Sequence, residues 1–209
     1  MSGYILYDFS HSSASYRVRI ALALKGLAYD TRLVNLRAGE QSAPDYLALA
    51  PAGLVPSLML PDGTTLTQSL AIIRFLDTLA EPRLFPTDPL ADAGVSALSL
   101  AIACDIHPIN NLRVLGYLQT ELDVSDDAKS DWYAHWVRTG FTALETEIAK
   151  CGGLYCFGDI LSAADVCLVP QMANARRFAV DVSKFPLLTA INDRLCAIPE
   201  FIAAEPSAL

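Results

Sequence analysis

The sequence is poor in the features that mark membrane, secreted and nucleic-acid-binding proteins. Apolar residues make up 53% of its 209 positions, yet they form no run close to the roughly 18 residues of a membrane span. No basic stretch followed by an apolar segment stands near the first residues, so we expect no secretory signal. The net charge of −8 disfavours nucleic acid and anionic membranes as partners.

The cysteines do not form the framework of a disulfide-stabilised domain. The five of them are an odd number without dense spacing, which favours reduced thiols and a cytoplasmic location. Cys151 and Cys156 are the nearest pair, and neither a second pair nor a histidine lies beside them. We therefore expect no metal site.

A short strand followed by a hydroxyl-rich helix start stands near the N-terminus. Aromatic and aliphatic residues at 4–7 predict the strand. Ser12, Ser13 and Ser15 then precede a run of helix formers that ends before Gly26, where a left-handed cap is favoured. Exposed amides and the helix dipole at such a start attract an anion. We predict that this anion is the thiolate of a ligand, because helix capping alone would need only one hydroxyl.

The pattern along the rest of the chain predicts two domains. Over about the first 80 residues, strand and helix signals alternate as β-α-β-α-β-β-α, with a hairpin turn at 61–63. Prolines at 82, 86 and 89 mark a linker, after which strand signals vanish. Apolar periodicity then predicts helices over 90–121, 127–150, 162–178 and 187–198. Ser162 and Asp165 form a capping-box pattern at one helix start, so we interpret Asp165 as structural.

Four motifs in order resemble the zeta class of glutathione transferases, the maleylacetoacetate isomerase family. They are the run from Ser12 to Leu22, the run Gln68-Ser69-Leu70-Ala71-Ile72-Ile73, the run from Asp105 to Leu115, and Leu168-Val169-Pro170-Gln171 followed by Asn174 to Phe178. The last two are similar to bacterial maleylacetoacetate and maleylpyruvate isomerases. The resemblance covers essentially the whole chain. It implies a thioredoxin-like, glutathione-binding domain over residues 1–82, an all-helical substrate-binding domain over 88–209, and a homodimer.

The resemblance also implies an enzyme with glutathione as its cofactor. Members of the family turn a cis double bond of a maleyl-type dicarboxylate into trans by thiolate addition, bond rotation and elimination. We expect the conversion of maleylacetoacetate to fumarylacetoacetate. Maleylpyruvate isomerisation and conjugation of glutathione to small electrophiles are the alternatives. A thiol–disulfide oxidoreductase would need a cysteine at the first helix, which is absent, and a non-catalytic glutathione-binding protein could lose Ser12 or the arginines, which are present.

The motif matches place the glutathione site in the first domain. Ser12 would donate to the sulfur, and Val55 would make main-chain bonds to the cysteinyl part of glutathione. The family holds the proline that follows in the cis form, although the sequence cannot show that Pro56 is cis. Gln68 and Ser69 would bind the γ-glutamyl carboxylate, whereas Ser69 could also be an ordinary helix cap. The implied cofactor-binding set is Ser12, Ser13, Ala14, Val55, Pro56, Gln68 and Ser69.

Cations and polar groups of the second domain are candidates for the substrate. Arg177 is the expected carboxylate clamp, because a guanidinium pairs with a carboxylate through two hydrogen bonds. Arg176 points about 100° away on a helix, and either arginine could instead lie on a solvated face. Arg113 is a second clamp candidate, and His107 could bind substrate, move a proton or be a core residue. The substrate-binding set is His11, His107, Asn111, Arg113, Arg176 and Arg177, and the catalytic set is Ser12, Ser13, His107 and Arg177.

Two residues depart from the family pattern. Ala14 stands where the zeta class usually has cysteine, and a methyl group cannot act as a thiol, acid or base. Isomerisation through Ser12 and glutathione does not require that cysteine. His11 stands where relatives often have arginine, which removes a fixed positive charge and bears on the choice of substrate.

Overall fold

The computed structural model describes residues 3–206. Its contacts divide the chain into two compact units. The first unit runs through Leu84 and takes in the segment from Ala197, and the second spans Phe85–Cys196. The predicted linker prolines lie around this division. No periodicity in the sequence indicated that the final segment packs with the first unit.

The first unit contains a mixed four-stranded sheet in the order β2-β1-β3-β4. The strands are β1 Tyr4–Asp8, β2 Tyr29–Leu33, β3 Ser57–Met59 and β4 Thr65–Thr67. β1 pairs in parallel with β2 and antiparallel with β3, and β3 pairs antiparallel with β4 across the predicted turn. Parallel neighbours need a crossover connection, which helix α1, Ser13–Leu24, supplies. The order of strands and helices predicted for this domain is confirmed.

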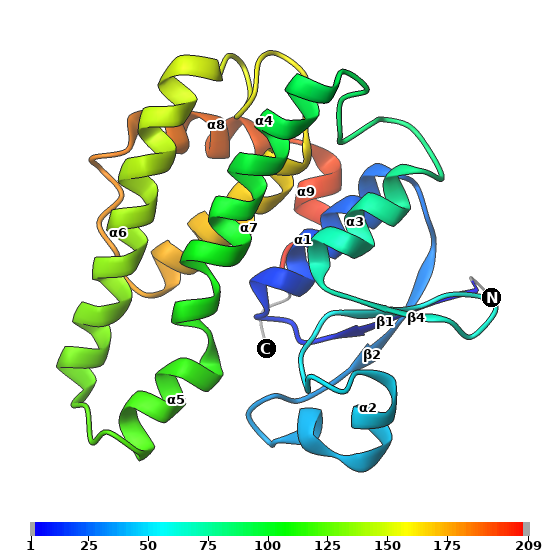
Figure 1. The fold of residues 1–209 in the computed structure, drawn as a ribbon, viewed down its shortest axis with the longest axis vertical. Coiled ribbons are helices and arrows are strands. Elements are labelled where there is room, and N and C mark those ends of the chain that lie inside the picture. Colours follow the sequence, from blue (N-terminus) through cyan, green and yellow to red (C-terminus); the bar gives the residue numbers. More distant parts are fainter. Residues whose placement is uncertain (1–2, 207–209) are drawn as a thin grey trace. The chain divides into compact units, whose positions relative to one another are not determined.

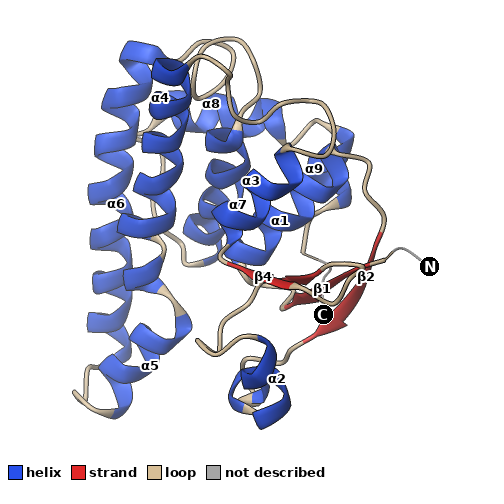
Figure 2. Cartoon of the chain, turned by 45° about the vertical axis from the view of Figure 1, so that its right-hand side comes forward, coloured by secondary structure: helices blue, strands red, loops and turns tan. Residues whose placement is uncertain are grey.

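Helices cover both faces of this sheet. α1 packs against α3, Ser69–Asp77, and against α9, Pro199–Ala203. The 3₁₀ turn Glu40–Ser42 leads into α2, Pro44–Leu49, which lies on the opposite face (Figure 2). Gly26 follows α1 with φ +62°, so the predicted left-handed cap is confirmed.

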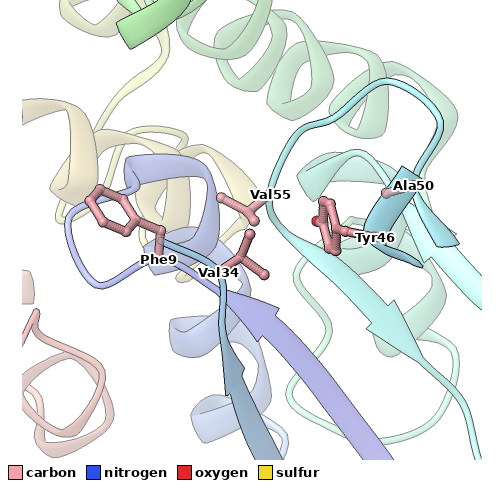
Figure 3. Packing of buried hydrophobic residues seen from close by; sticks show 5 residues of the cluster. All are labelled: Phe9, Val34, Tyr46, Ala50 and Val55. Carbon is pink, nitrogen blue, oxygen red and sulfur yellow. The ribbon is translucent and has the colours of Figure 1, made fainter. Parts of the chain in front are cut away.

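A small apolar cluster packs α2 against the ends of the strands (Figure 3). Its buried members are Phe9, Val34, Tyr46, Ala50 and Val55. The Tyr46 hydroxyl donates to the Leu54 carbonyl at 2.7 Å and lies 3.2 Å from Ser57 Oγ. Burial raises the pKa of Tyr46, which therefore stays a neutral donor. These contacts fix the loop that leads into β3.

The second unit is built of helices, as predicted. They are α4 Pro89–Leu100, α5 Leu112–Thr120, α6 Asp126–Cys151, α7 Ala163–Arg177 and α8 Pro186–Leu195. α7 is buried along most of its length and packs against both α4 and α8 (Figure 1). The Ser162 amide donates to the Asp165 carboxylate at 2.8 Å, and the predicted capping box is confirmed. Asp165 is thus a structural residue.

The helical segment predicted over 90–121 is confirmed, with a break in its α-helical geometry on either side of His107, where Pro108 predicts a bend. A π-helical segment η2, Ala101–Ile106, is followed by the 3₁₀ helix η3, Pro108–Asn110. Pro108 lacks an amide hydrogen and clashes with a continuing α-helix. Gly140 of α6 lets η2 approach closely, since a Cβ there would collide with the Ile106 side chain. π-Helical turns occur often at functional sites, and His107 follows this one directly.

Among the described residues, one helical stretch, Pro89–Thr120, is long and apolar enough to cross a membrane by length and composition alone. The apolar runs of the sequence did not indicate this stretch. Core helices of soluble folds pass the same test. In this stretch Val95, Leu98, Ile102 and Ile106 are buried, and 28% of the window that passes the test is buried inside the fold.

Candidate active site

The start of α1 offers an anion several hydrogen-bond donors. Ser12 is the N-cap, and its side chain accepts from the Ser15 amide at 3.2 Å. The first turn of α1 contains no acidic side chain, so nothing in it offsets the positive end of the helix dipole. Ser13 and Ser15 are buried, and Ser15 Oγ has no hydrogen-bond partner among the described residues. The side chain of Ala14, in this turn, is only a methyl group.

Arg17 adds a cation beside the start of α3. Its side chain is 1% exposed and donates through Nη1 to Ser69 Oγ at 3.3 Å. Ser69 is the first residue of α3, and Gln68 before it has a φ of +68°, which residues other than glycine rarely adopt. A carboxylate here would meet helix amides, a hydroxyl and a buried guanidinium. The sequence predicted Gln68 and Ser69 but missed Arg17, whose signal was its four-residue spacing from Ser13 on an apolar helix.

Val55 and Pro56 lie between α2 and β3, and the peptide bond between them is cis. Val55 belongs to the apolar cluster with Phe9, which places this loop beside the segment entering α1 (Figure 3). His11 packs edge-on against the Phe9 ring, with 6.1 Å between centroids. The predicted cofactor segments 12–14, 55–56 and 68–69 thus lie on linked elements of the first unit.

The predicted substrate residues His107, Asn111 and Arg113 belong to the second unit. His107 lies between η2 and η3. Asn111 is the N-cap of α5, and its Oδ1 accepts from the Val114 amide at 3.1 Å. Its Oδ1 atom is therefore occupied as the helix cap. Arg113, in the first turn of α5, is exposed.

The adjacent arginines at the end of α7 have different neighbours. Arg176 forms an ion pair with Asp193 of α8, with 3.1 Å between Nη2 and Oδ1. The Arg177 guanidinium instead lies 5.2 Å from the centroid of the Phe178 ring. Phe178 in turn stacks on Tyr133 of α6, with the centroids 4.0 Å apart. The two arginines thus have different aromatic and charged neighbours.

The arrangement in the first unit fits glutathione. The start of α1 suits a thiolate, because it combines helix amides with the Ser12 hydroxyl and has no acidic side chain. The start of α3 suits a carboxylate, because Ser69 and the buried Arg17 meet there. The described residues hold no group of three or more His, Cys, Asp or Glu placed to bind a metal ion.

Comparison with known proteins points the same way. Residues 11–79 match the family model described as glutathione S-transferase, N-terminal domain. The chain is 49% identical to a probable maleylacetoacetate isomerase of Vibrio cholerae serotype O1, over 99% of this chain and 97% of the relative. A holo structure of a maleyl pyruvate isomerase, a bacterial glutathione S-transferase in the zeta class, superposes with a TM-score of 0.94. That structure is 39% identical, and the match covers 98% of each chain.

A further solved relative holds ligands. It is a maleylacetoacetate isomerase from Anaeromyxobacter dehalogenans 2CP-1 with dicarboxyethyl glutathione and citrate bound in its active site. The TM-score is 0.86 at 37% identity, covering 97% of this chain and 94% of that one. The fold predicted from the sequence, a thioredoxin-like domain followed by helices, is confirmed. The chain belongs to the maleylacetoacetate isomerase family, in the zeta class of glutathione transferases.

Proposed function

We propose that this chain is a glutathione-dependent cis–trans isomerase that converts maleylacetoacetate to fumarylacetoacetate. The observation that carries the proposal is the 49% identity, along 99% of the chain, to a relative named for that activity. The hydroxyl-lined start of α1 gives independent physical support. When bound, glutathione supplies a thiolate that adds to the double bond, allows rotation about the resulting single bond, and leaves again.

The residues of the first unit hold and activate the cofactor. The Ser12 hydroxyl and the amides at the start of α1 stabilise the sulfur as a thiolate, whose pKa falls below the ~8.5 of a thiol in water. Gln68, Ser69 and Arg17 bind the γ-glutamyl carboxylate. Val55 offers main-chain groups to the rest of the peptide, in a loop that Tyr46 holds in place.

The residues of the second unit bind the substrate. Arg177 grips one carboxylate through its guanidinium fork, and Arg113 is the candidate for the other. His107 and the Nδ2 group of Asn111 face the oxygen atoms on which negative charge develops, where a hydrogen-bond donor stabilises it. Arg176 pairs with Asp193 at an exposed position, and the family motif favours Arg177 as the clamp.

Maleylpyruvate is the second candidate substrate, because a maleyl pyruvate isomerase and a maleylacetoacetate isomerase both superpose with a TM-score of 0.94. The two acids share the maleyl group and differ in the length of the attached oxo acid. The same residues would bind either of them. Conjugation of glutathione to small electrophiles is the remaining alternative, and it needs no carboxylate clamp.

Purified protein incubated with each maleyl acid, with and without glutathione, tests the proposal. Chromatography follows the cis and trans isomers and the free glutathione. We expect trans product only when glutathione is present, with no net loss of glutathione and faster turnover of maleylacetoacetate. Accumulation of a stable adduct would favour conjugation. Absence of turnover with both acids would contradict the isomerase.

We also propose a homodimer and a cytoplasmic location. Exposed apolar side chains recur at spacings of three and four residues along α4 and η2, which makes a continuous face. These side chains are Leu90, Ala93, Ala97, Leu100 and Cys104. A second copy of the chain would cover this face. Cysteines without disulfide bonds between them support the cytoplasmic location.

A further inference from the structure

One aromatic pair holds the end of α7 against α6. The Phe178 ring stacks on the Tyr133 ring with centroids 4.0 Å apart and planes inclined by 20°. Tyr133 is 3% exposed and Phe178 is 39% exposed. The buried ring therefore anchors a residue that lies partly at the surface.

Arg177 contacts the same pair. Its guanidinium carbon lies 5.2 Å from the centroid of the Phe178 ring, within the range of a cation–π contact. Burial raises the pKa of the Tyr133 phenol, and the positive charge of Arg177 opposes part of that rise. The charge of Arg177 is thus close enough to act on Tyr133. A guanidinium resting on a fixed ring has fewer orientations than one on a free surface arginine.

The same turn of α6 also contacts the other predicted substrate segment. Trp132 donates through Nε1 to the Ile109 carbonyl at 3.0 Å. The Tyr133 carbonyl accepts from Asn110 Nδ2 at 3.5 Å. Ile109 and Asn110 belong to η3, which joins His107 to Asn111. Two adjacent residues of one long helix therefore touch both segments that carry the candidate substrate residues.

We propose that Tyr133 is a positioning residue that, through Phe178, orients the Arg177 guanidinium for one carboxylate of the substrate. The inference rests on the proposed function, because it takes Arg177 as the carboxylate clamp. α6 also contacts η3 through Trp132 and the Tyr133 main-chain carbonyl, so one turn of α6 anchors both segments. A clamp fixed before binding loses little orientational freedom when the substrate arrives.

Three variants test this role. Tyr133→Ala removes the ring beneath Phe178, Tyr133→Phe keeps the ring, and Phe178→Leu removes the connecting ring at a half-exposed position. We expect Tyr133→Ala and Phe178→Leu to raise KM for maleylacetoacetate roughly tenfold, with kcat changed less than about threefold. Tyr133→Phe should keep KM for maleylacetoacetate at the wild-type value. KM for glutathione should not change, because its binding segments belong to the first unit.

Phe141→Leu is the matched control. Phe141 is a fully buried ring on the same helix, in edge-to-face contact with Phe185 at 5.5 Å between centroids. Its loss should lower the melting temperature without raising KM for the dicarboxylate. An equal rise of KM in Phe141→Leu and Tyr133→Ala would overturn the proposal, because it would indicate general loosening of α6. If Tyr133→Ala does not fold, Phe178→Leu decides by the same criterion.

Calorimetric binding of malonate, in the presence of glutathione, separates this proposal from the isomerase itself. If the wild-type chain isomerises its substrate and KM is unchanged in Tyr133→Ala and Phe178→Leu, the positioning role alone is overturned. A wild-type chain that isomerises neither acid, yet binds malonate about tenfold more tightly than Tyr133→Ala, would overturn the isomerase and support the positioning role. A wild-type chain that neither isomerises nor binds malonate would overturn both.

Discussion

Ser12 is both the cap of α1 and the proposed donor to the glutathione sulfur, and two substitutions separate these roles. Ser12→Ala removes both, so we expect a loss of about 1 kcal/mol in the free energy of unfolding and of roughly 10²-fold in kcat. Ser12→Asp keeps a good cap but sets a negative charge beside the thiolate. It should keep the stability and lose the activity, with a raised pKa of the bound thiol.

Urea denaturation measures the stability, and ultraviolet absorbance of the thiolate against pH measures the pKa of bound glutathione. Ser162→Ala is the control, since Ser162 caps α7. It should lower stability without changing that pKa. Full activity in Ser12→Asp would contradict the role of Ser12 as a donor.

At the residue scale, the local sequence pattern predicted where helices begin and end. It did not predict which side chains on other helices their residues contact. The hydroxyls before α1 and the capping box at Ser162 are set by neighbours within four residues, and the sequence therefore predicted both. The ion pair of Arg176 depends on Asp193, which lies on another helix. The burial of Arg17 depends on α3 in the same way. The assignments of Ser12, His107 and Arg177 to catalytic roles remain predictions.

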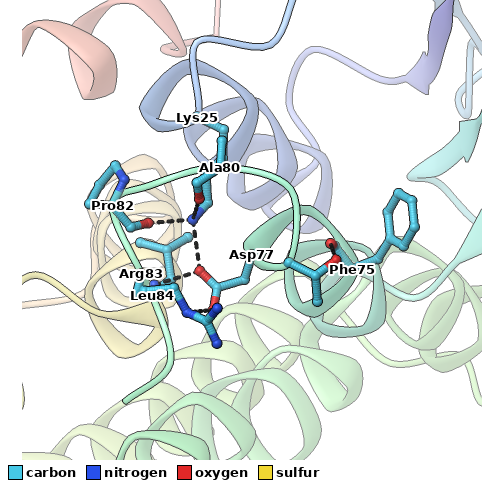
Figure 4. Close-up of polar contacts among 8 residues, drawn as sticks. Lys25, Phe75, Asp77, Ala80, Pro82, Arg83 and Leu84 are labelled. Atoms are coloured by element: carbon cyan, nitrogen blue, oxygen red, sulfur yellow. Dashed lines mark hydrogen bonds and ion pairs between the residues drawn. The ribbon is translucent and has the colours of Figure 1, made fainter. Parts of the chain in front are cut away.

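At the scale of elements, Lys25 ties the end of α1 to α3 and to the segment that follows it (Figure 4). Its Nζ donates to Asp77 Oδ1 and to the Ala80 carbonyl, both at 2.7 Å, and also to the Pro82 carbonyl. The Leu84 amide donates to the same carboxylate oxygen at 2.6 Å. The side chains of Lys25 and Asp77 are 0% and 3% exposed, so this ion pair is screened little by solvent.

Lys25→Met should therefore leave the Asp77 carboxylate buried without its main counter-charge. We expect the free energy of unfolding to fall by about 3–5 kcal/mol, measured by urea denaturation. Lys150→Met breaks a pair of similar length, 2.7 Å to Glu147, at an exposed position. That control should cost less than about 1 kcal/mol. Similar losses in the two variants would contradict a special role for the buried pair.

Elements with strong periodicity were predictable and the irregular ones were not. The helices α6 and α7 and the strands of the first unit lie where apolar spacing placed them. The short helix α9 was missed, because its five residues are too few to show a period. The π-helical segment η2 was missed because apolar spacing continues through it, and its contact with Gly140 joins distant parts of the chain.

At the scale of the whole molecule, the exposed apolar face on α4 and η2 predicts the state of assembly. Sedimentation equilibrium should give a molecular mass twice that of one chain, which is 22.6 kDa. Leu100→Glu should yield a monomer, because it places a charge in the centre of that face. Leu122→Glu, at a side chain 58% exposed beyond α5, should remain dimeric. A monomeric wild-type chain would contradict the proposed dimer.

Buried thiol and phenol groups with raised pKa predict how the free energy of unfolding changes at high pH. Burial, with a smaller effect of the Asp165 carboxylate, raises the pKa of Cys156 well above 9.0. The unfolded chain then releases this proton at a lower pH than the folded chain. The contribution to stability is complete below the unfolded pKa and is lost as pH rises through the folded pKa. Burial raises the pKa of Tyr46 and Tyr133 as well, with the same sign.

We therefore expect the free energy of unfolding to fall with rising pH above about 9, at most about 1.4 kcal/mol per pH unit for each such group. Urea titrations at several pH values measure this slope. Cys156→Ala should make it shallower, whereas Cys104→Ala, at an exposed position, should not. A steeper slope in Cys156→Ala would contradict the assignment.

All the cysteines of the chain, at 104, 151, 156, 167 and 196, belong to the second unit, Phe85–Cys196. The first unit, with Ala14 at the start of α1, therefore has no sulfur that could form a mixed disulfide with the tripeptide it is proposed to bind. Oxidation of the cellular glutathione pool cannot attach the cofactor covalently to that unit. Any mixed disulfide with glutathione would have to form on the second unit, where the Cys104 thiol is exposed.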